Sequence, residues 1–440
     1  MKKAMHVVAP AVALCLTLLA LTSVPTQAQS FTGSISGAVS DPSGAVVNNA
    51  TVTLTAIATG QTRTVTTNHA GEYNFPSLPP GEYKIRIAAS GFTAGEISAR
   101  LAVAQQLRAD AQLKVGTENE TVNISAGEGE VTTDRQNAEL STLLTGRQIT
   151  ELPLITRNPY DLITLSGGAT DGPDRGSGNQ RGAGFAVNGQ RSQSANFMLD
   201  GGENNDTFTS MPGQTVPLDA IQEFRVQTSD FTAEFGRGAG YVANVVTKSG
   251  SNSFHGSAYE FNRNSALAAN DSFSNANGFP KEFFNRNQFG FSAGGPVIKD
   301  KTFFFGSAEW LKVRSSVNSG FFVPTPQLLA LTSAATQSIF SQFAAPAITG
   351  RTVTAASLGF NNLIDAGGNP IDPNTPLFGR VTTTVPRDAG AGSPQNTALW
   401  TLRFDHNFSP RTSLFGRYAY DREEALTGSN SFSPYQGFNT

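Results

Sequence analysis

Residues 287–310, NQFGFSAGGPVIKDKTFFFGSAEW, decide the fold class of this chain. In the first half of this stretch, Phe289, Phe291 and Ala293 recur at every second position, as side chains on one face of a β-strand do. The other face of that strand holds the small or polar residues Gln288, Gly290, Ser292 and Gly294. In the second half, one face of a second strand collects Phe304, Gly306, Ala308 and Trp310. The stretch predicts an antiparallel hairpin with one aromatic face.

Three further segments extend this pattern. Ser253–Asn262 precedes the hairpin, and two strands follow it near residues 400–405 and 413–421. In this later pair the apolar face holds Trp400, Leu402, Phe404, Leu414, Gly416, Tyr418 and Tyr420, and the polar face holds Thr401, Arg403, Asp405, Ser413, Arg417 and Asp421. The pattern is apolar outside and polar inside, which is typical of a transmembrane β-barrel. A soluble sandwich is the alternative.

The connections between these strands differ in length as they do in outer-membrane barrels. Short turns at 295–301 and 407–411 alternate with long segments at 263–284 and 314–397. Large outer-membrane barrels whose lumen holds a plug have about 22 strands, whereas about five strands are found here. Open sheet edges cannot face lipid. We therefore expect residues 251–440 to be the start of an incomplete barrel, with further strands beyond Thr440.

Residues 135–250 hold an ordered set of short motifs. In chain order they read ITELPL (149–154), RNPYDL (157–162), FAVNGQR (185–191), NFMLDG (196–201), IQEFRV (221–226), EFGRGAG (234–240) and VVTKSG (245–250). This set resembles the plug of TonB-dependent receptors, and in particular of Oar-like members. The resemblance implies a mixed α/β plug domain. Its candidate motif residues are Arg157, Asn158, Asn188, Gly189, Asp200, Gly201, Gly236 and Gly238.

Two of these motifs have other interpretations. The glycines at 236, 238 and 240 do not follow the spacing of a nucleotide loop, and a strand rather than a helix is expected after them. The acidic stretch 200–206 lacks the glycine that a calcium-binding EF-hand loop needs at its sixth position. We expect this stretch to be a solvated loop between plug strands.

Residues 29–116 alternate short Thr-, Val- and Ile-rich strands with turn clusters, which predicts a β-sandwich. The motifs SGAV (36–39), TVTL (51–54), GEYNF (71–75) and PGEY (80–83) resemble the carboxypeptidase regulatory-like domain. That resemblance implies an Ig-like or prealbumin-like sandwich, with Tyr73 and Phe75 in the core and Pro80–Gly81 as a turn. Carbohydrate binding by this domain is an alternative function, although no aromatic platform is visible in the sequence.

The linker at 117–134 contains an alternating segment that suits an extended strand. Its position ahead of the plug resembles a TonB box, which a periplasmic partner would bind by β-augmentation. A plain linker strand is the other interpretation. The candidate box residues are Glu120, Thr121, Val122, Asn123, Ile124, Ser125 and Ala126.

The first 28 residues are expected to be a secretory signal peptide. Lys2 and Lys3 precede an apolar run at 7–21 that is short for a spanning helix. Cleavage is predicted between Ala28 and Gln29. Because Cys15 lies in this segment, the mature chain would contain no cysteine.

The composition and the polar residues exclude several function classes. A net charge of -3 gives no footprint for nucleic acid. The four histidines, at 6, 69, 255 and 406, are widely spaced, and no zinc motif or nucleophile elbow occurs. We expect no enzymatic activity and no cofactor.

The function implied by these resemblances is energised uptake of an unidentified ligand through a plugged barrel in the bacterial outer membrane. Carbohydrates and peptides are the candidate ligand classes. The expected partners of the protein are a TonB-type energy-transducing protein, outer-membrane lipid and that ligand. The N-terminal domain would lie in the periplasm. Adhesion or a structural role at the cell surface is the alternative.

Overall fold

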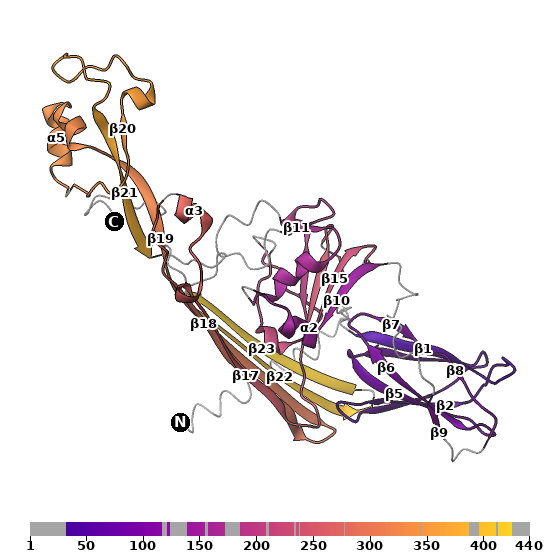
Figure 1. Cartoon of the computed structure of the whole chain (residues 1–440). Helices are drawn as coiled ribbons and strands as arrows, with labels where there is room; N and C mark the ends of the chain where they lie inside the picture. The colour runs from indigo at the N-terminus through magenta and orange to yellow at the C-terminus, as the bar shows by residue number, and fades with distance from the viewer. Residues whose placement is uncertain are drawn as a thin grey trace, which may run out of the picture.

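The computed structural model describes residues 32–116, 121–123, 139–154, 157–171, 185–207, 211–232, 235–236, 238–276, 278–343, 345–386, 396–410 and 412–424. The expected signal peptide, its cleavage site at Ala28 and Gln29, and residues 120 and 124–126 of the candidate box lie outside these ranges. Figure 1 shows three consecutive units, namely an N-terminal domain, a plug unit (139–250) and a barrel sheet (255–424), with an arm extending from the last.

The N-terminal domain is a sandwich of two β-sheets. One sheet contains β4 (Glu72–Leu78), β1 (Gly33–Ser40), β7 (Gln106–Arg108) and β8 (Ala111–Gln112). The other has the order β3 (Thr62–Thr66), β2 (Thr51–Ala56), β5 (Gly81–Ala88), β6 (Ala94–Leu101) and β9 (Thr121–Asn123). Along β1 and β5 buried residues alternate with less buried ones, because only one face of each strand meets the other sheet.

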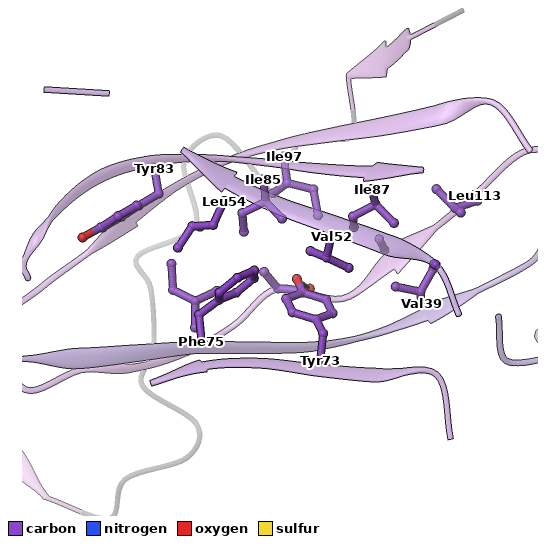
Figure 2. Close-up of a cluster of buried hydrophobic side chains, with 14 of the residues drawn as sticks. Val39, Val52, Leu54, Tyr73, Phe75, Tyr83, Ile85, Ile87, Ile97 and Leu113 are labelled. Carbon is purple, nitrogen blue, oxygen red and sulfur yellow. Dashed lines mark hydrogen bonds between the residues drawn. The ribbon is translucent and has the colours of Figure 1, made fainter. Parts of the chain in front are cut away.

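The core of this sandwich confirms the roles predicted for its aromatic residues. Tyr73 and Phe75 point from β4 toward Val52, Leu54 and the isoleucines of β5 and β6 (Figure 2). The Tyr73 hydroxyl donates a hydrogen bond to the carbonyl of Ala109, so its polar end is satisfied inside the core. Pro80 and Gly81 make the turn into β5, as expected.

The plug unit is built on a mixed sheet with the order β10 (Leu140–Thr145), β15 (Ile221–Ser229), β16 (Val242–Thr247), β13 (Asn196–Leu199) and β14 (Gly202–Glu203). A separate ribbon pairs β11 (Ala169–Asp171) with β12 (Phe185–Val187). Short helices complete the unit: α2 (Gly146–Glu151), η1 (Pro159–Leu165), η3 (Ser192–Ser194) and η4 (Leu218–Ala220). Every residue of β16 is buried, which places this strand at the centre of the unit. The mixed α/β plug is therefore confirmed.

The barrel sheet is an antiparallel meander of the five strands predicted from the sequence. These are β17 (His255–Asn264), β18 (Phe284–Ile298), β19 (Thr302–Pro324), β22 (Asn396–Ser409) and β23 (Thr412–Glu424). η6 (Ser265–Leu267) and α3 (Ser272–Ala276) lie in the connection between β17 and β18. In the described residues β17 and β23 are the two ends of this meander, so the sheet is open.

The predicted alternation is present along β18 and β22. Phe289 and Phe291 are exposed on one face of β18, while Gln288 and Ser292 are buried on the other. On the exposed face, aromatic rings follow one another across the sheet. Their centroid separations are 5.7 Å for Phe289–Trp310, 6.4 Å for Trp310–Trp400 and 5.5 Å for Trp400–Tyr420. Such a row suits the interface between a membrane and water.

The arm replaces what the sequence predicted to be a long loop at 314–397. β19 continues to Pro324 and pairs with β21 (Pro376–Pro386), which also pairs with β20 (Thr352–Thr354). The arm also contains α4 (Pro326–Ala330), α5 (Ala334–Phe340) and η7 (Ala356–Leu358). Figure 1 shows it at the end of the barrel sheet away from the N-terminal domain. Among the described residues, no helix is long and apolar enough to cross a membrane.

Candidate functional site between plug, barrel wall and N-terminal domain

The plug unit packs against the inner face of the barrel sheet (Figure 1), and Arg157 makes the first of two buried ion clusters there. Its guanidinium lies 2.6 Å from a carboxylate oxygen of Asp219 in the plug and 3.7 Å from one of Glu309 on β19. It also lies over the rings of Tyr259 and Phe261, at 4.7 and 4.3 Å from their centroids. The Arg157 cluster thus joins the plug to two strands of the wall by charge and by cation–π contact.

Neighbouring polar groups hold Glu309 in place. The Tyr259 hydroxyl donates to one carboxylate oxygen at 2.7 Å, and the Gln288 amide donates to the other at 2.8 Å. Both oxygens of this buried carboxylate are therefore satisfied without displacing Arg157.

Asp200 is the centre of the second cluster. One of its oxygens accepts from the Thr247 backbone N–H and the other from the Thr247 hydroxyl, each at 2.7 Å. Arg403 of β22 and Arg417 of β23 approach the same carboxylate to 3.5 and 3.2 Å. The Asp200 side chain is only 2% exposed. The expectation of a solvated loop is therefore wrong at Asp200, although Glu203 and Asp206 in the same stretch are exposed.

Several candidate plug residues act through the backbone. Asn188 and Gly189 have φ values of 52° and 75°, and they form the two-residue turn between β12 and Gln190. Asp200 and Gly201, at 49° and 78°, form the turn between β13 and β14. Both are turns with two left-handed residues, which Asn-Gly and Asp-Gly pairs favour.

The remaining candidates support packing of the plug. Asn158 accepts a hydrogen bond from the Tyr160 backbone N–H at the start of η1. A Cβ on Gly238 would lie 2.8 Å from the backbone nitrogen of Asn196, so only glycine allows this approach. Gly236 has a φ of 50°. The structure brings Arg157, Asn158 and Asp200 close to polar partners and gives the glycines structural roles.

A third contact joins the plug to the N-terminal domain. The backbone N–H of Val103 donates to the Glu223 carboxylate at 2.8 Å, and the Val103 carbonyl accepts from Arg225 at 2.6 Å. Burial raises the pKa of Glu223, against the opposing effects of the Val103 hydrogen bond and Arg100. The amide of Gln222 also reaches the Pro80 carbonyl at 3.2 Å. Sequence reasoning missed this contact, because the Val103 backbone carries no side-chain signal.

The candidate box is described only at Thr121–Asn123. These residues form β9, which pairs in parallel with β6 over Ala94–Glu96. The segment is extended, but its backbone is already paired with the N-terminal domain.

A cavity of about 370 Å³ lies between the plug and strands β17 and β18. Plug residues 150–154 and Arg157 form one wall, and the other contains Phe261, Arg263 and Arg286. Its lining is therefore rich in guanidinium groups. Among the residues that the structure describes, no group of three or more His, Cys, Asp or Glu residues could hold a metal ion.

Comparisons with known proteins agree with this architecture. Residues 34–114 match the family model of the carboxypeptidase regulatory-like domain, and residues 246–440 match that of an outer membrane beta barrel domain. The TonB-dependent transporter Oar of Myxococcus xanthus is 27% identical over 260 residues, which are 55% of this chain. The match spans only 23% of the length of that relative.

Solved structures give weaker likenesses. The siderophore receptor PirA of Acinetobacter baumannii is 15% identical, with a TM-score of 0.32, over 64% of this chain and 48% of that one. The outer membrane transporter YddB of Escherichia coli is 11% identical, with a TM-score of 0.33, over 61% and 37%. The two matched domains and the Oar relative are the stronger findings, and they locate the protein in the outer membrane. The chain is thus similar to the TonB-dependent transporter Oar, and it contains an N-terminal carboxypeptidase regulatory-like domain and an outer membrane beta barrel domain.

Proposed function

We propose that the protein takes up a ligand across the outer membrane by energy-dependent movement of its plug. The observation that carries this proposal is the pair of buried ion clusters around Arg157 and Asp200, which hold the plug against four barrel strands. Separating a buried ion pair leaves an uncompensated charge, which costs about 3–5 kcal/mol. Thermal motion alone would rarely break both clusters together, so plug movement needs an external source of work.

The linker before the plug is where this work would be applied. Residues 120–126 precede β10, and a periplasmic partner of the TonB type would pair with them through backbone hydrogen bonds. In the structure Thr121–Asn123 pair with only three residues of β6, and in parallel. A parallel ladder is slightly less stable per residue than an antiparallel one. A longer partner strand would therefore displace it.

The ligand site belongs on the plug face that meets the wall. The cavity lined by Phe261, Arg263 and Arg286 offers an aromatic ring and guanidinium donors. These groups suit carbohydrate hydroxyls or the carboxylates of peptides. We infer binding and transport rather than catalysis.

Deletion of residues 120–126 from the full-length protein tests the role of the linker. We expect the deletion to abolish binding of the purified periplasmic domain of the partner, measured by calorimetry. In cells the same deletion should stop uptake of a mixed library of labelled oligosaccharides and peptides while binding at the surface continues. Replacement by a Gly-Ser segment of equal length is the control for linker length. Undiminished uptake by the deletion variant would contradict the proposal.

Adhesion is a second candidate function, and the arm favours it. β19, β21 and two helices extend away from the barrel sheet, with Phe322, Ile339 and Phe360 exposed. Removing residues 316–386 should abolish attachment of cells to a surface if the arm is adhesive. If attachment were unchanged, and uptake were lost in cells that lack the energy-transducing partner, only the transport function would remain supported.

A further inference from the structure

The loop Ala102–Gln105 of the N-terminal domain lies on the plug sheet and is held there by two charged side chains. Glu223 and Arg225 are two residues apart on β15, so they share one face of the strand. They bond to the N–H and the carbonyl of Val103, at 2.8 and 2.6 Å. Beside them Ala104 packs against Met198, Phe235 and Val242. Charge-assisted hydrogen bonds of this kind are stronger than neutral ones.

Arg225 also holds the point where the linker enters the plug. Its guanidinium pairs with the carboxylate of Glu139 and lies 3.1 Å from the Ser141 hydroxyl. The second oxygen of Glu139 accepts from the Gln227 amide at 2.7 Å. All three charged side chains, Glu139, Glu223 and Arg225, are nearly inaccessible to water. One arginine therefore contacts both the N-terminal domain and Glu139, the first described residue of the plug unit.

Among the described residues of the plug unit, Glu139 lies nearest the linker, so tension on the linker would break its contacts first. In the described residues β10 forms an edge of the plug sheet and pairs only with β15. Its first pair is Leu140 with Ser229, directly after Glu139. Tension from the linker would peel β10 from this end, removing Glu139 and then Ser141 from Arg225.

The neighbouring buried polar groups make the domain contact reversible. Both amide atoms of Asn244 and the Gln227 side-chain oxygen are buried without a hydrogen-bond partner. Asn244 lies opposite Arg225 in the ladder and therefore on the same face. Unpaired buried groups lower the stability of the docked state, and hydration on opening would recover part of that loss. If Arg225 lost Glu139, it would remain beside Glu223, whose carboxylate accepts the hydrogen bond of the Val103 N–H.

We propose that tension on the linker releases the N-terminal domain from the plug through a change of partners at Arg225. The groups involved are Glu139, Arg225, Glu223 and the Val103 backbone, and we call them the fastener. When Glu139 is withdrawn, Arg225 pairs with Glu223, and this new pair expels Val103 from both of its hydrogen bonds. The plug edge and the domain contact then open together. This inference rests on the proposed function only for the source of the tension.

Hydrogen–deuterium exchange on the full-length protein in lipid nanodiscs tests this change of ion-pair partners at Arg225. The measurement needs no ligand, no partner protein and no applied force. Glu139→Gln removes the charge that holds Arg225 and keeps the shape of the side chain. We expect the Val103 amide, measured in peptides covering 100–106, to exchange at least tenfold faster than in the unsubstituted protein. Glu151→Gln is the matched control, because Glu151 is an exposed partner of Arg147 on the same unit. In the Glu151→Gln variant, the hydrogen–deuterium exchange rate of the Val103 amide should not change.

Faster exchange in β10 with unchanged exchange at Val103 would overturn the fastener, because Glu139 would then stabilise only its own strand. A second measurement needs no substitution within the plug. A tether on Glu130→Cys pulls the linker while Val103 exchange is followed at increasing force. Release of Val103 at the force that opens β10 supports the proposal, and retention of Val103 after β10 has opened contradicts it. Either result leaves open whether the natural partner binds residues 120–126, which the deletion experiment decides.

Discussion

At the residue scale, the plug depends on one buried carboxylate that faces two arginines of the wall. Asp200→Asn would remove the buried charge that Arg403 and Arg417 share, although Arg403 would keep its ion pair with Asp405. We expect a loss of about 3–5 kcal/mol in the free energy that holds plug and wall together. Thermal unfolding of the full-length protein in detergent, followed by tryptophan fluorescence, measures this. Glu203→Gln, on the exposed part of the same hairpin, is the control and should have little effect.

Glu223 makes the stability of the folded protein depend on pH. Its pKa is raised above the ordinary 4.5, mainly by burial. A raised pKa in the folded state means that protonation of Glu223 favours folding, so this contribution to stability is complete below about 4.5 and is lost as the pH rises through the folded-state pKa. We expect the midpoint temperature of unfolding in detergent to fall across this range. Glu223→Gln should remove the dependence. A pH dependence that persists in this variant would assign the effect to another group.

At the element scale, strands are predicted best where their two faces differ most. β18 and β22 alternate aromatic with polar residues, and the structure matches that pattern. The arm was predicted as a loop because Thr, Val and Gly in 376–386 give little contrast between faces. Its strands form because β19 supplies a partner. The buried state of Asp200 was not predictable either, since Arg403 and Arg417 lie about two hundred residues away in the chain.

The pairing of β9 with β6 gives a prediction about capture of the linker. Gly95 and Val122 are register partners in this parallel ladder. A disulfide between Gly95→Cys and Val122→Cys, in a mature chain expected to have no other cysteine, would hold β9 on the domain. We expect at least tenfold weaker binding of the partner's periplasmic domain when oxidised and full recovery after reduction. Equal affinity in both states would show that the partner uses the other edge of β9.

At the scale of the whole molecule, the N-terminal domain is anchored at two places, the plug and the barrel rim. The rim contact is a hydrogen bond of 2.9 Å from the Asn252 backbone N–H to the Ala58 carbonyl. Nearby, Asp300 lies close to Gly60 and bonds to the Asn252 side chain at 2.7 Å. Two weak contacts within one chain act together. When one contact is formed, it holds the two surfaces of the other contact near each other, at an effective concentration of about the millimolar range.

This arrangement predicts non-additive loss of docking. Gly60→Leu would drive a side chain into Asp300, since a Cβ there lies 2.5 Å from the carboxylate oxygen, and Glu223→Ala would remove the acceptor of Val103. Either change alone should leave the domain mostly docked, whereas both together should free it. Distances between spin labels on the domain and on the barrel turn measure the docked fraction. Gly44→Leu is the control, because Gly44 has a similar positive φ but nothing near its Cβ. If Gly60→Leu alone frees the domain, the rim rather than the plug is its principal anchor, and the two contacts do not cooperate.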